Sequence, residues 1–164
     1  MVRLVKHAFT GTVTVRHLDE AGMKGGCLGC LHCAAENRCV YRDGFMQFWE
    51  EMIDPADIIV IAGSIRDRFL SSGWKQFMDW SFYHGHIPAM NGKQVICLIH
   101  GPLSDHPILR EVPGSVITIW GAGIVAVISD ESSDPDATSR QIHTAAMPAV
   151  AYLKTGFPCT TDVP

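Results

Sequence analysis

The sequence has few charged residues and no cluster of basic ones. Only 18% of its 164 residues are charged, and the formal net charge is −4. Proteins that bind nucleic acid usually present a concentrated basic surface, so we do not expect a nucleic-acid partner. Hydrophobic residues make up 47% of the chain, which excludes a mainly disordered protein and predicts a globular one.

Signals for export and for membrane insertion are also missing. The first nine residues carry Arg3, Lys6 and His7 without an apolar block, so they do not resemble a signal peptide. The longest apolar run, residues 116–128, contains two glycines and is too short to span a bilayer. We therefore expect a cytoplasmic protein with no membrane partner, whose thiols stay in a reducing compartment.

Familiar catalytic signatures are absent as well. No Ser/His/Asp or Cys/His hydrolytic arrangement stands in a recognisable local context, and the sequence contains no glycine-rich nucleotide fingerprint. No residue is therefore assigned as catalytic. The chemistry-bearing residues are instead concentrated in one short stretch.

Four of the six cysteines lie within residues 25–39, with the spacing C-x2-C-x2-C-x5-C. They are Cys27, Cys30, Cys33 and Cys39. Gly25, Gly26 and Gly29 allow the backbone to fold tightly, so the thiols can converge on one point. Four thiolates suit a [4Fe–4S] cluster or zinc. Because zinc ribbons usually take two separated pairs, the spacing favours iron–sulfur, with zinc as the alternative metal. Free thiols or a pair of disulfides remain the alternative to any metal.

Hydrophobic periodicity predicts helices that alternate with strands. Helices are expected near residues 3–10, 43–53, 72–82 and 134–154, with capping residues such as Asp43 and Asp134. Strands are expected at residues 12–18, 58–62, 94–99 and 124–128. Residues 116–120 fit a strand or a helix equally, and the tail after residue 156 is expected to be loose. The alternation predicts one α/β domain, residues 1–164, built on a doubly wound parallel sheet.

The order of these elements around the cysteine loop resembles the iron-sulfur flavoproteins. These belong to the NADPH-dependent FMN reductase branch of the flavodoxin-like fold. The resemblance covers about residues 3–128. It is most specific from Cys27 to Asp79, through Cys-Leu-Gly-Cys-Leu-His-Cys…Cys-Val, a helix, Ala56-Asp57 with an apolar strand, and Lys75…Asp79. It implies FMN at the carboxyl ends of the strands, a cluster on the four cysteines, and homo-oligomers in which cluster and flavin of different subunits approach each other.

Two features depart from the family pattern. The family begins with a strand and a phosphate-binding loop, whereas residues 1–11 here align with the helix after that loop. The family also has a Pro-x-Tyr-like segment against the flavin ring, where this chain has Ser64, Ile65 and Arg66, and Arg68 where a glycine is common. We therefore expect weak FMN binding and a sheet that lacks or replaces its first strand. Another chain donates a strand, the flanking strands close up, or the chain is truncated at its N-terminus.

The resemblance places flavin contacts after two successive strands. These residues are Gly63, Ser64, Ile65 and Arg66 after the first strand, and His100 and Gly101 after the second. It implies a redox protein, similar to an NAD(P)H-dependent FMN reductase, that transfers electrons between FMN and the cluster. Its partners would be a redox protein or a small-molecule acceptor, and it would form a homo-oligomer or join another subunit. The alternative is a degenerate, non-catalytic flavodoxin-like subunit with a structural metal or none.

One stretch is unusually rich in large apolar side chains. It contains Trp74, Phe77, Met78, Trp80, Phe82 and Tyr83. They are too many to bury on one helix face, so some are expected at a subunit interface.

Overall fold

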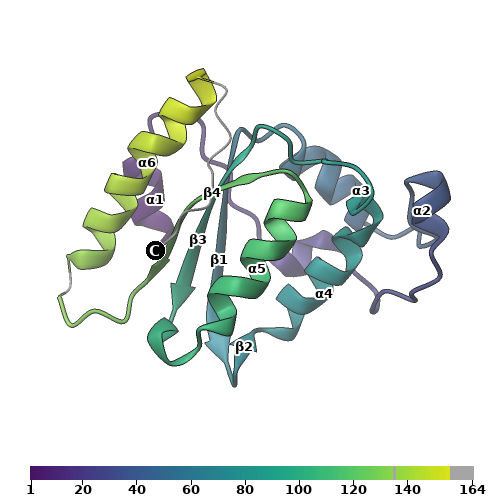
Figure 1. Cartoon of the computed structure of the whole chain (residues 1–164), viewed down its shortest axis with the longest axis horizontal. Helices are drawn as coiled ribbons and strands as arrows, with labels where there is room; N and C mark the ends of the chain where they lie inside the picture. Colours follow the sequence, from purple (N-terminus) through teal and green to yellow (C-terminus); the bar gives the residue numbers. More distant parts are fainter. Residues whose placement is uncertain (135, 156–164) are drawn as a thin grey trace.

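The computed structural model describes residues 1–134 and 136–155. A four-stranded sheet of order β2-β1-β3-β4 forms its centre (Figure 1). Three strands are parallel: β1 (Ile58–Arg66), β3 (Gln94–His100) and β4 (Gly123–Ser129). The short β2 (Phe69–Leu70) returns antiparallel along the end of β1. The fold is α/β, consistent with the predicted flavodoxin-like, doubly wound class.

Helices cover both faces of the sheet (Figure 1). On one face α1 (Val2–Ala8) packs with α6 (Ala137–Thr155). The other face carries α3 (Phe45–Phe48), α4 (Ser72–Trp80) and α5 (Ile108–Ile119). The short α2 (His32–Glu36) lies at the end of the molecule farthest from α6. The π-helix η2 (Trp49–Ile53) continues α3, and three 3-10 turns complete the structure: η1 (Leu18–Ala21), η3 (Ser81–His84) and η4 (Leu103–Asp105). Within the described residues, no helix has both the length and the apolarity to cross a bilayer.

The central strand β3 divides the core into two halves. Its residues Val95 to Ile99 are 0–3% exposed, because helices cover both sides of it. Ile96 and Leu98 join the cluster under α1 and α6, whereas Val95 and Cys97 join the aromatic cluster under α3 and α4. Alternate side chains of a strand point to opposite faces, so one apolar run supplies both halves.

The predicted strand at residues 12–18 is wrong. Residues 12–17 run from α1 toward η1 without regular structure, and no pairing to the sheet involves them in the described part of the chain. Val13 contacts the cluster under α1 and α6, while Thr12, Thr14 and Val15 remain exposed. Strand propensity becomes a strand only through pairing, and this segment does not pair with the edge of the sheet. The described sheet therefore has no gap between two flanking strands, and β1 lies at the edge of its parallel part.

In one further segment the structure differs from the prediction, and in another it settles a choice between strand and helix. The strand expected at residues 58–62 continues to Arg66, and Ile65 pairs with Leu70 of β2, so Gly63 and Ser64 do not open a loop. Residues 116–119, which fitted either structure, belong to α5, where Leu109 and Ile117 are buried on one face. The other predicted helices and strands are confirmed. The tail after residue 155, with Cys159, lies outside the described residues.

Three of the six large apolar side chains in the stretch from Trp74 to Tyr83 are buried in the core. Phe77, Trp80 and Tyr83 are 2–4% exposed and surround the ring of Phe45 at centroid distances of 5.5–6.2 Å. Trp74 and Met78 are half-buried, and Phe82 is 60% exposed. The rings belong to both α4 and η3, so they point in several directions and more of them can be buried than one helix face allows.

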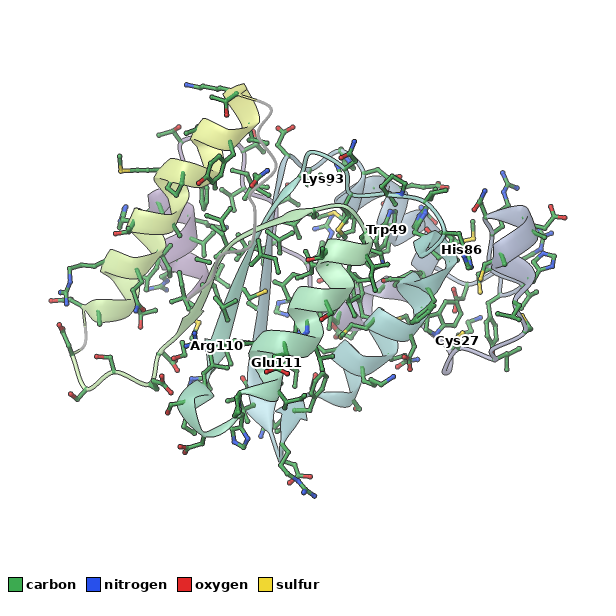
Figure 2. All side chains as sticks on the ribbon, in the orientation of Figure 1. Cys27, Trp49, His86, Lys93, Arg110 and Glu111 are labelled. Atoms are coloured by element: carbon green, nitrogen blue, oxygen red, sulfur yellow. The ribbon has the colours of Figure 1, made fainter. Side chains whose placement is uncertain are left out.

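Figure 2 shows labelled side chains near the amino and carboxyl edges of the sheet. At the amino edge, Lys93 Nζ donates to the carbonyls of Asp54 (2.7 Å) and Ala56 (2.8 Å), which joins the end of η2 to the start of β3. Arg110 and Glu111 lie in the first turn of α5, on the opposite, carboxyl side. The cysteine loop with Cys27 extends laterally from the sheet, beside α4.

Candidate functional site

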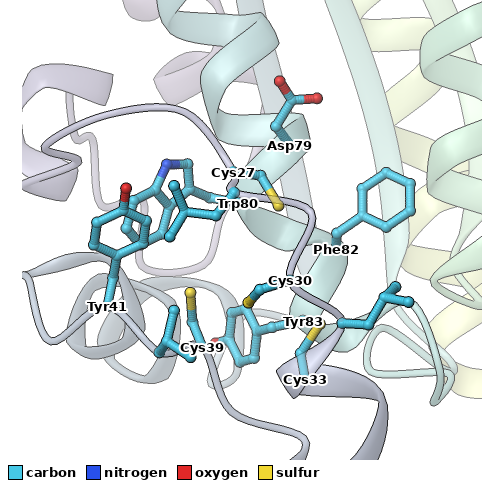
Figure 3. A pocket seen from close by; sticks show the side chains of 12 residues that line it. Cys27, Cys30, Cys33, Cys39, Tyr41, Asp79, Trp80, Phe82 and Tyr83 are labelled. Atoms are coloured by element: carbon cyan, nitrogen blue, oxygen red, sulfur yellow. The ribbon is translucent and has the colours of Figure 1, made fainter.

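The four clustered cysteines line a single small cavity (Figure 3). Its volume is about 30 Å³, and Tyr41, Trp80, Phe82 and Tyr83 complete much of its wall. Two of the thiols, Cys27 and Cys30, belong to exposed residues, whereas Cys33 and Cys39 are half-buried. All four cysteines singled out by their spacing in the sequence thus line the same cavity.

The backbone of the loop has an unusual local geometry. Gly29, Leu31 and Asn37 are all left-handed, with φ of 63°, 58° and 49°. For a bulky residue such as Leu31 this conformation costs about 1–2 kcal/mol. Gly29 N–H donates to Cys27 Sγ at 3.4 Å, which orients the first thiol. Backbone strain of this kind clusters at functional sites in proteins.

The thiols influence one another electrostatically. Burial raises the pKa of Cys39, the backbone N–H of Tyr41 opposes this, and charge on Cys27 and Cys33 raises the pKa further. A free Cys39 is therefore protonated at neutral pH. A coordinated metal ion would reverse this, because its charge deprotonates a coordinating thiol.

The thiols do not yet stand in ligand geometry. Among the described residues, no group of three or more His, Cys, Asp or Glu side chains is placed to hold a metal ion. Binding a metal would therefore require the loop to move. Gly26 and Gly29 leave room for this movement, because a Cβ built on either would meet nothing within 4 Å.

The residues predicted to contact a flavin lie together at the carboxyl edge of the sheet. Ser64 is in register with His100, and a Cβ built on Gly101 would lie 3.3 Å from Ile65 Cβ. They lie on a strand and hairpin rather than on an open loop. Trp74 packs against Gly63, where an added Cβ would be 2.8 Å from the indole Nε1, and this Nε1 donates to Ala62 O at 3.1 Å. Neither of the two cavities described for the chain includes these residues.

Asp130 is a member of this edge that the sequence did not reveal. One of its carboxylate oxygens lies 2.6 Å from His100 Nδ1, and the other accepts the N–H of Gly101 at 3.0 Å. Partial burial raises the pKa of Asp130, but these hydrogen bonds outweigh it, so the pKa lies below its ordinary value. The sequence did contain a signal for this pair. Asp130 and His100 each stand at the carboxyl end of a predicted parallel strand, and the carboxyl ends of parallel strands lie at the same edge of a sheet.

Comparisons with known proteins support the fold and leave the site open. No protein-family model matches the chain, and no curated protein matches it. Among solved structures, it is similar to the X-ray structure of an oxidoreductase from Corynebacterium diphtheriae, with a TM-score of 0.58 and 14% sequence identity. The match covers 93% of this chain and 82% of that chain. At this identity the likeness shows the fold alone: the chain has an α/β fold that an oxidoreductase also adopts.

Proposed function

We propose that this chain is a redox protein whose cysteine loop binds a [4Fe–4S] cluster through Cys27, Cys30, Cys33 and Cys39. One observation carries the proposal: four thiols from a stretch of thirteen residues line one cavity. Four cysteine thiolates are the usual donor set of such a cluster, so the chemistry of the site fits. When bound, the cluster would supply one-electron chemistry.

The surroundings of the thiols support a functional role. Leu28 and Leu31 are 64% and 72% exposed, and Val40 and Phe82 add to the same apolar rim. Exposed apolar patches are typical of interaction sites, so this rim would let a redox partner approach the thiols closely. Gly29 N–H would offset negative charge on Cys27 Sγ, since hydrogen bonds to sulfur tune such centres.

The flavin part of the proposal concerns the carboxyl edge. As the family resemblance implies, FMN would bind beside Ser64, Ile65 and His100 and exchange electrons with the cluster. Its ring would contact the β1–β2 hairpin and the His100–Asp130 pair. Because no phosphate loop has been identified, we expect binding weaker than micromolar. Sub-micromolar binding in an FMN titration would show that another segment holds the phosphate.

A second candidate is a non-catalytic module with structural zinc on the same cysteines. The donor set favours it, because four cysteine thiolates are also a usual ligand set of structural zinc, and the same four cysteines line the cavity. The protein would then serve as a subunit or partner module.

Anaerobic purification followed by iron and sulfide analysis separates the two candidates. The cluster proposal predicts stoichiometric iron and sulfide after reconstitution, and a marked loss of both in Cys30→Ser. Cys97→Ala is the matched control, because Cys97 is buried in β3 away from the loop. Zinc at one equivalent supports the second candidate, and iron at background after reconstitution contradicts the first.

A further inference from the structure

We infer that Gln76 and Trp80 of α4 are positioning residues for the cysteine loop. Both donate a side-chain N–H to one acceptor, the carbonyl of Gly25, where the loop begins. Trp80 Nε1 lies 2.6 Å from this oxygen, and Gln76 Nε2 makes the second hydrogen bond. The two donors are four residues apart on α4, so they share one helix face and can both hydrogen-bond the same carbonyl.

Trp80 also holds the other end of the loop. Its ring packs on that of Tyr41, with centroids 4.6 Å apart, and Tyr41 follows Cys39 by two residues. The two ends lie close together, since a Cβ built on Gly25 would be 3.7 Å from Tyr41 Oη. One indole, only 2% exposed, therefore connects the entrance of the loop with its exit.

Asp43 closes the base of the loop just outside this point. Its carboxylate accepts the N–H of Lys24 at 3.2 Å and that of Phe45 at 3.1 Å. Between the two closures, the hydrogen bonds of the loop residues are local, such as the one from Gly29 N–H to Cys27 Sγ. The direction in which the chain leaves Gly25 thus sets where Cys27 is presented.

This arrangement has a consequence for any metal on the four thiols. Trp80 is itself part of the cavity wall, so its two contacts fix the loop ends beside the thiols. If the donors were lost, metal binding would have to order a looser loop, and part of the binding energy would be lost. The expected effect on metal binding rests on the proposed function. The expected effect on thiol reactivity in the metal-free protein does not.

The test compares Gln76→Leu and Trp80→Phe with Gln47→Leu as control. Gln47 is exposed and hydrogen-bonds only Glu51 within its own helical segment. In metal-free protein, iodoacetamide labelling followed by mass spectrometry should show half-buried Cys39, two residues before Tyr41, alkylated roughly fivefold faster in both variants, because local opening exposes it. The rate at Cys97 should not change. In metal-loaded protein, chelator-induced metal release should accelerate roughly tenfold.

The outcomes separate the two ideas. Faster labelling of Cys39 without a change at Cys97 supports the positioning role, even if the wild-type protein binds no metal, in which case only the proposed function fails. Equal acceleration at Cys39 and Cys97 would mean a global loss of stability and would overturn the positioning role. Unchanged labelling in Gln76→Leu would overturn it as well. Because Gln76 is only half-buried, that variant keeps the inference testable should Trp80→Phe fail to fold.

Discussion

The cysteine loop and the carboxyl edge of the sheet are built in opposite ways. At the edge, strand ladders fix the positions: Ser64 faces His100 by register, and Asp130 follows the last residue of β4. The loop takes part in no ladder, and its base is tied to the body by side chains such as Trp80 and Asp43. The edge is preformed, whereas the loop can adapt.

This difference explains why the two regions suit different ligands. A rigid edge offers fixed contacts to a molecule that already has the right shape. A loop of thiols that lines a cavity without ligand geometry can close around a metal, and metal binding then contributes to its order. The left-handed Leu31 shows that the loop already departs from relaxed backbone geometry. We therefore propose the loop, rather than the edge, as the metal site.

The largest effect that would test this contrast comes from a matched pair of glycines. Gly101→Ala should destabilise the protein by about 3 kcal/mol, because its φ is 120° and the new Cβ would press on Ile65. Gly29→Ala should cost only about 1–2 kcal/mol, since its φ is 63° and nothing lies within 4 Å. Urea unfolding of both variants measures the difference. Equal costs would mean that the loop is as tightly packed as the edge.

A smaller effect concerns the pH dependence of the edge. Asp130 has a lower pKa in the folded protein than in the unfolded chain, so it stabilises the fold above about pH 4. That contribution is lost as the pH falls through the folded pKa. Asp130→Asn should lower the urea midpoint at pH 7 and flatten its decline below about pH 4.

Asp105→Asn serves as control for the pH experiment. It removes a negative charge from an exposed residue of η4 without touching the His100–Asp130 pair. An Asp130→Asn variant whose midpoint falls with pH as steeply as that of the wild-type protein would contradict the assigned role of the pair.

The sequence predicted the fold where apolar runs or helical spacing were long. The run in β3 could only be a buried strand, and α4 was marked by its spacing of large side chains. Residues 12–18 misled because alternating Val and Thr report strand propensity but say nothing about a partner edge. The end of β1 was missed because Gly63-Ser64 is typical of a loop, while the actual turn is made by Asp67 with φ of 58°.

The candidate site was predictable only in its local part. Cysteine spacing within one short stretch was enough to find four residues that line the same cavity. The contacts of Gln76 and Trp80 with Gly25 join residues 51 and 55 positions apart, and no local pattern announces them. The pairing of His100 with Asp130 likewise depends on which strands are neighbours.

The most direct test of the central claim is cysteine footprinting before and after metal loading. The protein is reconstituted anaerobically with iron and sulfide, alkylated, and analysed by mass spectrometry, with the metal-free protein as reference. We predict that Cys27, Cys30, Cys33 and Cys39 lose reactivity together and that iron and sulfide are retained, whereas buried Cys97 reacts slowly in both states. Loop thiols that stay equally reactive, with iron at background, would contradict the account.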